Sequence, residues 1–228
     1  MERKLIITID GPSGAGKSTL SKLLAEKLNY THIDSGALYR AVALKVQQDG
    51  ADPDDDESLY HLCSDLAISF HQEKGRLTVM LDGKDVTDAI RDPGISMLAS
   101  RVSAKKTVRD ALLGVQRRLG KGGGIVVEGR DMGTVVFPDA EVKFFLDASL
   151  ETRGERRFHQ YRAQGKRYDI GTITRDIEKR DSDDSRRSLS PLKPAHDACT
   201  IDSTDMSIEE VVAEMLKTVA QHLSSPSK

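Results

Sequence analysis

The chain has 228 residues, and 34 lysines and arginines against 36 aspartates and glutamates give it a formal net charge of −2 at pH 7. This length suits one α/β domain with a small insertion. The balanced charge and the 4% aromatic content argue against a protein that binds nucleic acid through a basic, base-stacking surface.

The sequence also argues against a membrane or secreted protein. No apolar run approaches the roughly 20 residues needed to cross a bilayer, and no small-residue cleavage site follows the apolar start of the chain. Cys63 and Cys199 lie far apart and lack metal-ligand spacing, which is typical of a reducing compartment. We therefore expect a cytoplasmic enzyme without a membrane or nucleic-acid partner.

Apolar runs and helical patterns alternate at the start of the chain. Residues 4–10 (KLIITID) and 30–34 (YTHID) predict two buried strands, each followed by an amphipathic helix. Ser35 is placed to cap the second helix. The acidic run at residues 52–57 predicts an exposed loop.

The pattern then changes to short strands separated by glycine turns. Residues 67–86 contain three such runs, with turns at Lys74-Gly75 and Asp82-Gly83, which predict antiparallel strands. Because these strands interrupt the β-α alternation, we expect a small inserted subdomain over about residues 62–103.

The second half returns to the β-α pattern. Helices are predicted near residues 94–103 and 105–119. Three further strands are predicted at residues 125–128, 142–147 and 199–202, and a capping box at Ser207 and Glu210 opens a last helix. Five buried strands separated by helices predict an α/β fold, a parallel sheet with helices on both faces.

Residues 151–187 are rich in arginine, with nine of them in this stretch. The composition fits a solvated pair of helices with i,i+4 ion pairs. It also fits a segment that closes over a polyphosphate, because guanidinium groups bind phosphate through two donors and stay charged. Composition alone leaves both interpretations open.

Residues 11–18 match G-x-x-x-x-G-K-[ST] between a predicted strand and a predicted helix. The glycines let backbone N–H groups face phosphates at a helix N-terminus. We expect Lys17 to reach the β- and γ-phosphates and the Ser18 hydroxyl to face Mg²⁺, directly or through water. The predicted triphosphate site comprises Gly11, Pro12, Ser13, Gly14, Ala15, Gly16, Lys17, Ser18 and Thr19.

Two further motifs suit the acceptor of a phosphoryl group, and the base-reading N-K-x-D motif of a GTPase is missing from the sequence. After the second strand, Ser35 at a helix start and Arg40 suit an acceptor phosphate, although a plain helix cap and a surface arginine would look the same. After the third large strand, Arg130 and Asp131 offer a phosphate clamp and a hydrogen-bond acceptor. A strand-end salt bridge is the alternative there.

These segments together resemble the bacterial cytidylate kinases, which are P-loop nucleoside monophosphate kinases, over essentially the whole length. The resemblance rests on residues 9–19 (IDGPSGAGKST), 33–40 (IDSGALYR), 128–140 (EGRDMGTVVFPDA), 143–149 (KFFLDAS) and 179–192 (KRDSDDSRRSLSPL). It implies a single P-loop NTPase-type domain over residues 1–228 with a five-stranded parallel sheet. It also implies that the inserted strands form a subdomain for the monophosphate and that residues of about 153–187 form a helical lid.

The resemblance further implies a monomer that transfers the γ-phosphoryl group of ATP to CMP or dCMP with Mg²⁺. The acceptor phosphate would be held by Arg40, Arg130 and Arg187 near Ser35, the cytosine by Ser100, Arg109 and Asp131, and the ribose by Arg180 and Asp184. The lid would place Arg153 near adenine and Arg157 near the phosphates, with Arg156 as a competing choice. Lys17, Arg130, Arg157 and Arg187 would be the catalytic residues.

Two other functions stay open at this point. A related kinase would act on UMP, AMP or a small molecule such as shikimate. A regulatory or nucleic-acid-binding P-loop module would bind ATP without transferring phosphate, but such a module would not need the acceptor motifs.

Overall fold

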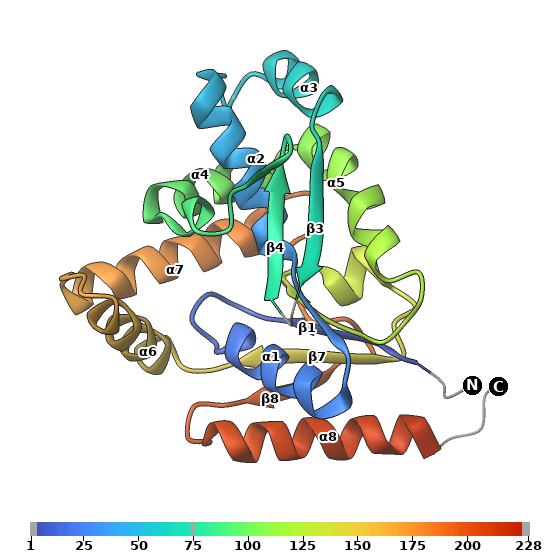
Figure 1. The fold of residues 1–228 in the computed structure, drawn as a ribbon. Helices are drawn as coiled ribbons and strands as arrows, with labels where there is room; N and C mark the ends of the chain where they lie inside the picture. Colours follow the sequence, from blue (N-terminus) through green and yellow to red (C-terminus); the bar gives the residue numbers. More distant parts are fainter. Residues whose placement is uncertain (1–3, 74–75, 225–228) are drawn as a thin grey trace. The chain divides into compact units, whose positions relative to one another are not determined.

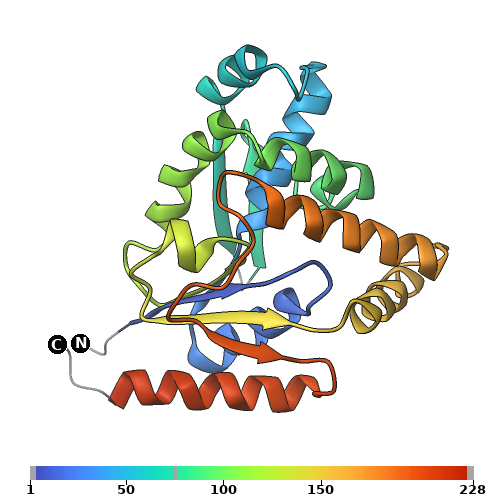
Figure 2. The ribbon, with the colours of Figure 1, turned by 180° about the vertical axis from the view of Figure 1, so that it is seen from behind.

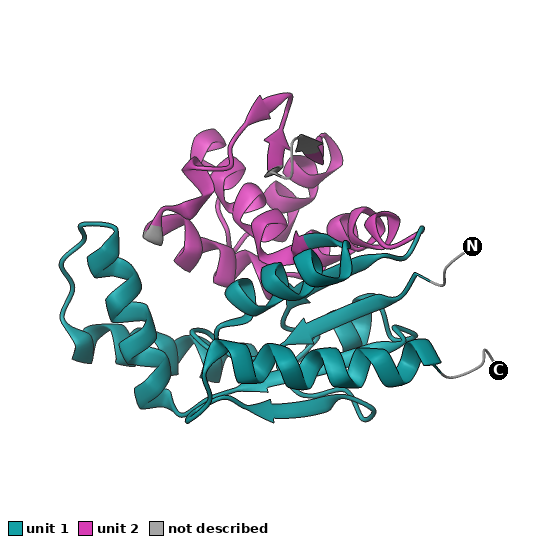
Figure 3. Ribbon diagram, turned by 60° about the horizontal axis from the view of Figure 1, so that its bottom comes forward, with its two compact units in different colours: residues 1–32, 122–228 teal, residues 33–121 magenta. Residues whose placement is uncertain are grey.

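The computed structural model describes residues 4–73 and 76–224. The chain forms two compact units, which Figure 3 shows in different colours. Unit 1 comprises Met1–His32 and Gly122–Lys228, and unit 2 comprises Ile33–Lys121. Among the described residues, no helix is long and apolar enough to cross a membrane.

A five-stranded parallel sheet confirms the predicted fold class (Figure 1). Its strands are β1 (Ile6–Asp10), β2 (Thr31–Asp34), β6 (Ile125–Gly129), β7 (Val142–Asp147) and β8 (Cys199–Asp202). Their order is β2-β6-β1-β7-β8, and β1 pairs in parallel with both β6 and β7. The central strand β1 is buried from Ile7 to Asp10, on both faces, as expected for a parallel sheet that is covered on both sides.

Helices α1 (Lys17–Leu28) and α8 (Ile208–Ser224) share one apolar core with the sheet, and Figure 2 shows α8 running alongside β8. In this core Leu24 and Met215 pack with Phe144. The predicted capping box is confirmed at the start of α8. The Ser207 N–H donates to Glu210 Oε2 at 2.8 Å and the Glu210 N–H donates to Ser207 Oγ at 3.2 Å.

The rest of unit 1 supplies the polar segments that follow the strands. A π-helical turn, η2 (Met132–Val136), comes after β6, and α6 (Leu150–Ala163) comes after β7. Helix α7 (Ile170–Arg186) pairs with α6. Thus the carboxyl ends of β1, β6 and β7 lead directly into the glycine-rich loop, η2 and α6.

Unit 2 combines helices with a small antiparallel sheet. Its helices are α2 (Ser35–Asp49), α3 (Asp56–Ser64), η1 (Ala89–Arg91), α4 (Pro93–Ser103) and α5 (Lys106–Leu119). Its strands are β3 (Ile68–Glu73), β4 (Arg76–Leu81) and β5 (Lys84–Asp85), and they pair antiparallel as predicted. Leu38, Val42, Leu59 and Leu112 lie in the core of this unit.

Of the two predicted hairpin turns, the structure describes one. Asp82 and Gly83 have φ values of 49° and 78°, the left-handed backbone that a two-residue hairpin requires. The turn predicted at Lys74-Gly75 lies outside the described residues. The segment of about residues 62–103, which we predicted as an insertion, lies within unit 2 together with α2, much of α3 and α5.

Two local predictions were wrong. Helix α2 begins at Ser35 with Asp34 in the capping position, so the predicted cap lies one residue too late. The acidic run 52–57 is not all loop, because the Asp55 carboxylate accepts from the Ser58 N–H at 3.0 Å and caps α3. A carboxylate satisfies an orphan N–H group of the first helical turn, so the end of an acidic run can start a helix.

Candidate active site

The loop between β1 and α1 follows the course that its sequence motif requires. A Cβ atom on Gly11 would lie 2.0 Å from the Leu146 carbonyl oxygen, and one on Gly14 would lie 2.9 Å from the Arg153 carbonyl oxygen. Gly14 also has a φ of 81°, in the left-handed region. Only glycine fits this close approach of backbone to β7 and α6.

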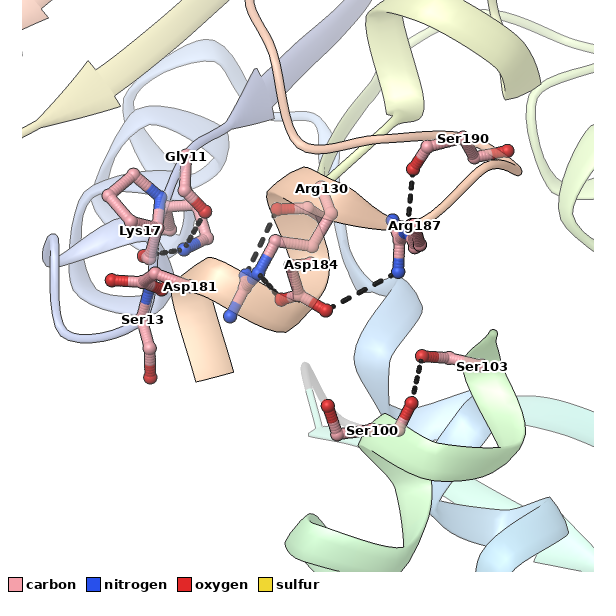
Figure 4. A network of polar contacts seen from close by, with 12 residues as sticks. Gly11, Ser13, Lys17, Ser100, Ser103, Arg130, Asp181, Asp184, Arg187 and Ser190 are labelled. Atoms are coloured by element: carbon pink, nitrogen blue, oxygen red, sulfur yellow. Dashed lines mark hydrogen bonds and ion pairs between the residues drawn. The ribbon is translucent and has the colours of Figure 1, made fainter. Parts of the chain in front are cut away.

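Lys17 begins α1 and folds back over this loop. Its Nζ donates to the carbonyl oxygens of Gly11 at 2.8 Å and Pro12 at 2.6 Å (Figure 4). Burial lowers the pKa of Lys17, and the neighbouring charges of Arg130 and Arg180 lower it further. These cations lie close enough together to attract a polyanion.

Glu128, at the end of β6, holds the Ser18 hydroxyl. Its Oε2 accepts from Ser18 Oγ at 2.8 Å, while its Oε1 accepts from Ser21 Oγ at 3.2 Å and contacts His32 Nε2 at 2.9 Å. Glu128 was not among the site residues predicted from the sequence, although its position at a strand end, two residues before Arg130, could have indicated a role.

This pair of oxygen donors suits Mg²⁺. Kinase sites bind that ion through one or two carboxylates, water and the substrate's phosphates rather than through a full protein cage. Ser18 and Glu128 supply such a set. Within residues 4–73 and 76–224, no group of three or more histidine, cysteine or acidic side chains is placed to hold a metal ion.

Asp10, the last residue of β1, anchors the segment that carries Asp131. Its carboxylate accepts from the Met132 N–H at 2.9 Å and the Gly133 N–H at 2.8 Å. Burial raises the pKa of Asp10 to about 6, because desolvation outweighs these two hydrogen bonds, and the charge of Asp131 adds to the rise. Asp131 itself is buried. Asp10 was not among the predicted site residues.

Three of the predicted acceptor residues form one cluster in unit 1 (Figure 4). Asp184 on α7 accepts from Arg130 Nε at 3.0 Å and from Arg187 Nη1 at 3.4 Å. Arg187 Nε also donates to the Ser190 carbonyl oxygen at 2.6 Å. The structure thus brings Arg130, Asp184 and Arg187 together from a strand end and a helix end, and each side chain is mostly buried.

The other predicted acceptor residues belong to unit 2. Arg40 pairs with Asp34 at 2.6 Å, and Ser35 is buried at the start of α2. The Arg109 guanidinium donates to the Ser103 carbonyl oxygen at 2.8 Å and lies 5.5 Å from the centre of the Tyr39 ring. Ser100, on α4, accepts through its carbonyl oxygen from Ser103 Oγ at 2.8 Å.

The three arginines of α6 that the resemblance suggests for the lid have different environments. Arg153 is buried and donates to the carbonyl oxygens of Ala148 and Ser13, both at 2.9 Å. Arg156 donates to the Ser203 carbonyl oxygen at 2.6 Å and lies 3.4 Å from the carbonyl oxygen of Ala15.

Arg157, by contrast, contacts its own helix. It donates to Gln160 Oε1 at 2.9 Å, and its guanidinium lies 5.7 Å from the centre of the Tyr161 ring.

Arg153 and Arg156 thus contact carbonyl groups of the glycine-rich loop. The ion pair of Arg153 with Asp181 joins α6 to α7 and is not an i,i+4 pair along one helix.

Comparison with known proteins agrees with these features. A family model described as cytidylate kinase matches residues 7–221. A protein of Syntrophotalea carbinolica named cytidylate kinase is 52% identical over 230 residues, covering 100% of this chain and 98% of its own length. Another of that name, from Geobacter sulfurreducens, is 52% identical and covers 96% of this chain and 94% of its own length.

A solved structure shows the same fold at low sequence identity. It is an uncharacterized protein from Eubacterium ventriosum with a TM-score of 0.53 and 13% identity, covering 96% of this chain and 99% of its own. That likeness concerns the fold alone. The family model over nearly the full length and relatives at 52% identity show that the chain belongs to the cytidylate kinase family.

Proposed function

We propose that the chain transfers the γ-phosphoryl group of ATP to CMP or dCMP, giving ADP and CDP or dCDP. The observation that carries this proposal is the cation cluster of unit 1, where Asp184 holds Arg130 and Arg187 and the buried Lys17 folds over the glycine-rich loop. The charge of Arg130 also lowers the pKa of Lys17. A site for a triphosphate and a clamp for a second phosphate therefore adjoin each other. The names of the relatives supply the identity of the acceptor.

On the donor side, the loop of residues 11–19 surrounds the phosphates, and Lys17 neutralises part of their charge. Backbone N–H groups of the loop face the phosphates, except at Pro12, which has none, and at Ser13, whose N–H donates to Asp181. Ser18, oriented by Glu128, would hold Mg²⁺, which when bound neutralises charge on the phosphate oxygens. Arg153, Arg156 and Arg157 belong to the lid, residues of about 153–187, which excludes water from the transfer. We assign to Arg157 the role of neutralising the negative charge on the transferred phosphoryl group, with Arg156 as the alternative.

On the acceptor side, Arg130, Arg187 and Arg40 hold the phosphate, with Ser35 beside it. Arg180 and Asp184 contact the ribose. Ser100, Arg109 and Asp131 contact the cytosine. The Asp131 carboxylate accepts from the cytosine amino group, whereas uracil would present a carbonyl oxygen and leave a buried acceptor unpaired.

The chemistry then needs little from the protein beyond alignment and charge. The acceptor phosphate is already ionised at neutral pH, so an oxygen of that group attacks the γ-phosphorus without a general base. Alignment of the two nucleotides converts a bimolecular step into an effectively unimolecular one. The arginines and Lys17 stabilise charge on the equatorial oxygens as the bond to ADP breaks.

An acceptor panel tests the proposal. Purified protein with ATP and Mg²⁺ is assayed for ADP release with CMP, dCMP, UMP, AMP or shikimate, and we expect the highest kcat/KM for CMP or dCMP. A higher value for another acceptor would contradict the proposal. Binding of nucleic acid without acceptor-dependent turnover would favour the regulatory P-loop module instead. We also propose that the enzyme acts as a monomer in the cytoplasm, which sedimentation and cell fractionation would test.

A further inference from the structure

Asp181, a residue without a role so far, joins α7 to the glycine-rich loop and to α6. Its Oδ1 accepts from the Ser13 N–H at 2.9 Å, and its Oδ2 forms an ion pair with Arg153 Nη1 (Figure 4 shows Ser13 and Asp181). The same Arg153 nitrogen donates to the Ser13 carbonyl oxygen at 2.9 Å. The Arg153 and Asp181 side chains are 10% and 15% exposed, so water screens this pair little.

These contacts fix a part of the loop that its own sequence leaves free to move. Ser13 lies between Gly11 and Gly14, and glycine places few steric limits on the backbone. The ion pair holds both the N–H and the carbonyl group of Ser13, and therefore limits the orientation of the peptide groups that precede Gly14. A loop held in this way loses less conformational entropy when it binds phosphate.

The same turn of α7 carries the acceptor cluster. Asp184 is three residues after Asp181, a spacing that places two side chains on neighbouring parts of one helix face. Asp184 contacts Arg130 and Arg187, while Asp181 contacts Ser13. A shift of this turn would move the phosphate clamp and the glycine-rich loop together.

We propose that Asp181 is a positioning residue that couples the two nucleotide sites energetically. A CMP phosphate bound by Arg130 and Arg187 would fix the position of this turn of α7. Asp181 would then restrict the backbone at Ser13 more tightly, and ATP would bind with higher affinity because the glycine-rich loop has less conformational entropy to lose. By linkage, ATP strengthens CMP binding by the same factor. The inference rests on the acceptor role proposed above for Arg130 and Arg187.

The test measures binding of a non-hydrolysable ATP analogue with Mg²⁺ by calorimetry, with and without saturating CMP. In the unaltered protein, we expect CMP to tighten analogue binding by about fivefold or more, the lower end of usual coupling. Asp181→Ala should raise the analogue Kd by about tenfold, abolish the coupling and change the Kd of CMP alone by less than about twofold. Asp183→Ala is the matched control, because Asp183 is an exposed carboxylate on the same helix.

Asp181→Asn gives a second, milder test that does not depend on the folding of the alanine variant. Its side-chain oxygen still accepts from the Ser13 N–H, but the ion pair with Arg153 is lost. We expect the coupling factor to fall by at least about half. Thermal unfolding of each variant separates loss of stability from loss of coupling.

The possible results have separate meanings. Coupling as strong in the Asp181 variants as in the control would overturn the inference, and so would independent binding of CMP and the analogue in the unaltered protein. If the protein does not bind CMP at all, the proposed function is refuted, and so is the claim that CMP binding at Arg130 and Arg187 affects the glycine-rich loop. Loss of coupling with CMP binding retained supports both.

Discussion

Asp184 and Arg130, separated by 54 residues in the chain, meet at 3.0 Å between the carboxylate Oδ2 and the guanidinium Nε. The other carboxylate oxygen faces Arg187 at 3.4 Å. One carboxylate therefore orients two guanidinium groups and leaves the cluster with a positive charge. Such a cluster suits a phosphate, because each guanidinium has further N–H donors in a fixed plane.

Replacement of Arg187 by alanine should therefore impair catalysis much more than folding. Arg187→Ala is expected to lower kcat/KM for CMP at least about a hundredfold, since a charge-assisted phosphate contact is lost in the transition state. Steady-state kinetics at varied CMP would measure this loss. Arg186→Ala removes the same charge from an exposed neighbour and should change kcat/KM little. A fully active Arg187→Ala enzyme would remove that residue from the site.

Base selection should depend on the buried carboxylate of Asp131. Asp131→Asn replaces one acceptor oxygen by an NH₂ donor, which suits the O4 carbonyl of uracil better than the amino group of cytosine. We expect the ratio of kcat/KM for CMP over UMP to fall by about tenfold or more. Asp139→Asn, an exposed residue of the same segment, is the control. An unchanged ratio would mean that the base is recognised by other residues.

The pKa of Asp10 predicts how stability depends on pH. Burial raises this pKa from 3.8 to about 6, so between these values the folded state binds more protons at Asp10 than the unfolded state. The contribution of this group to the free energy of unfolding therefore falls as pH rises from about 4 to about 6, by about 3 kcal/mol for a shift of this size.

Urea denaturation from about pH 4 to about pH 7 would measure this effect as the difference between the unaltered protein and Asp10→Asn, which does not titrate. We expect the unaltered protein to lose stability relative to the variant as pH rises. A constant difference, or one of opposite sign, would show that the pKa of Asp10 is not raised.

The Ser18 hydroxyl should determine how much Mg²⁺ the enzyme needs. Ser18→Ala removes the hydroxyl group that donates to Glu128, and with it the oxygen that we expect to face Mg²⁺. We expect the Mg²⁺ concentration for half-maximal activity to rise by about tenfold. Ser18→Thr retains the hydroxyl and should restore the original requirement, as the [ST] position of the motif allows. Equal Mg²⁺ requirements in the alanine and threonine variants would contradict this role.

The sequence by itself was enough to predict the elements and motifs that depend on neighbouring residues. The strands over 142–147 and 199–202, the capping box at Ser207 and the Asp82-Gly83 turn all follow from local periodicity, local hydrogen bonding or backbone sterics. The glycine-rich loop belongs to the same class, because its glycines and Lys17 stand at fixed spacing. Where capping was ambiguous between adjacent polar residues, as at Asp34 and Ser35, the prediction failed by one residue.

Only the tertiary structure decided which polar groups support the site. Asp10 reaches Met132 across 122 residues, Glu128 reaches Ser18 across 110, and Arg153 reaches Ser13 across 140. These contacts exist because β1 lies between β6 and β7, which brings the segments after those strands beside the loop that follows β1. The spacing of residues along α6 does not distinguish Arg153 from Arg156 or Arg157. The neighbours of each arginine depend on the strand order of the sheet, and sequence spacing contains no information about that order.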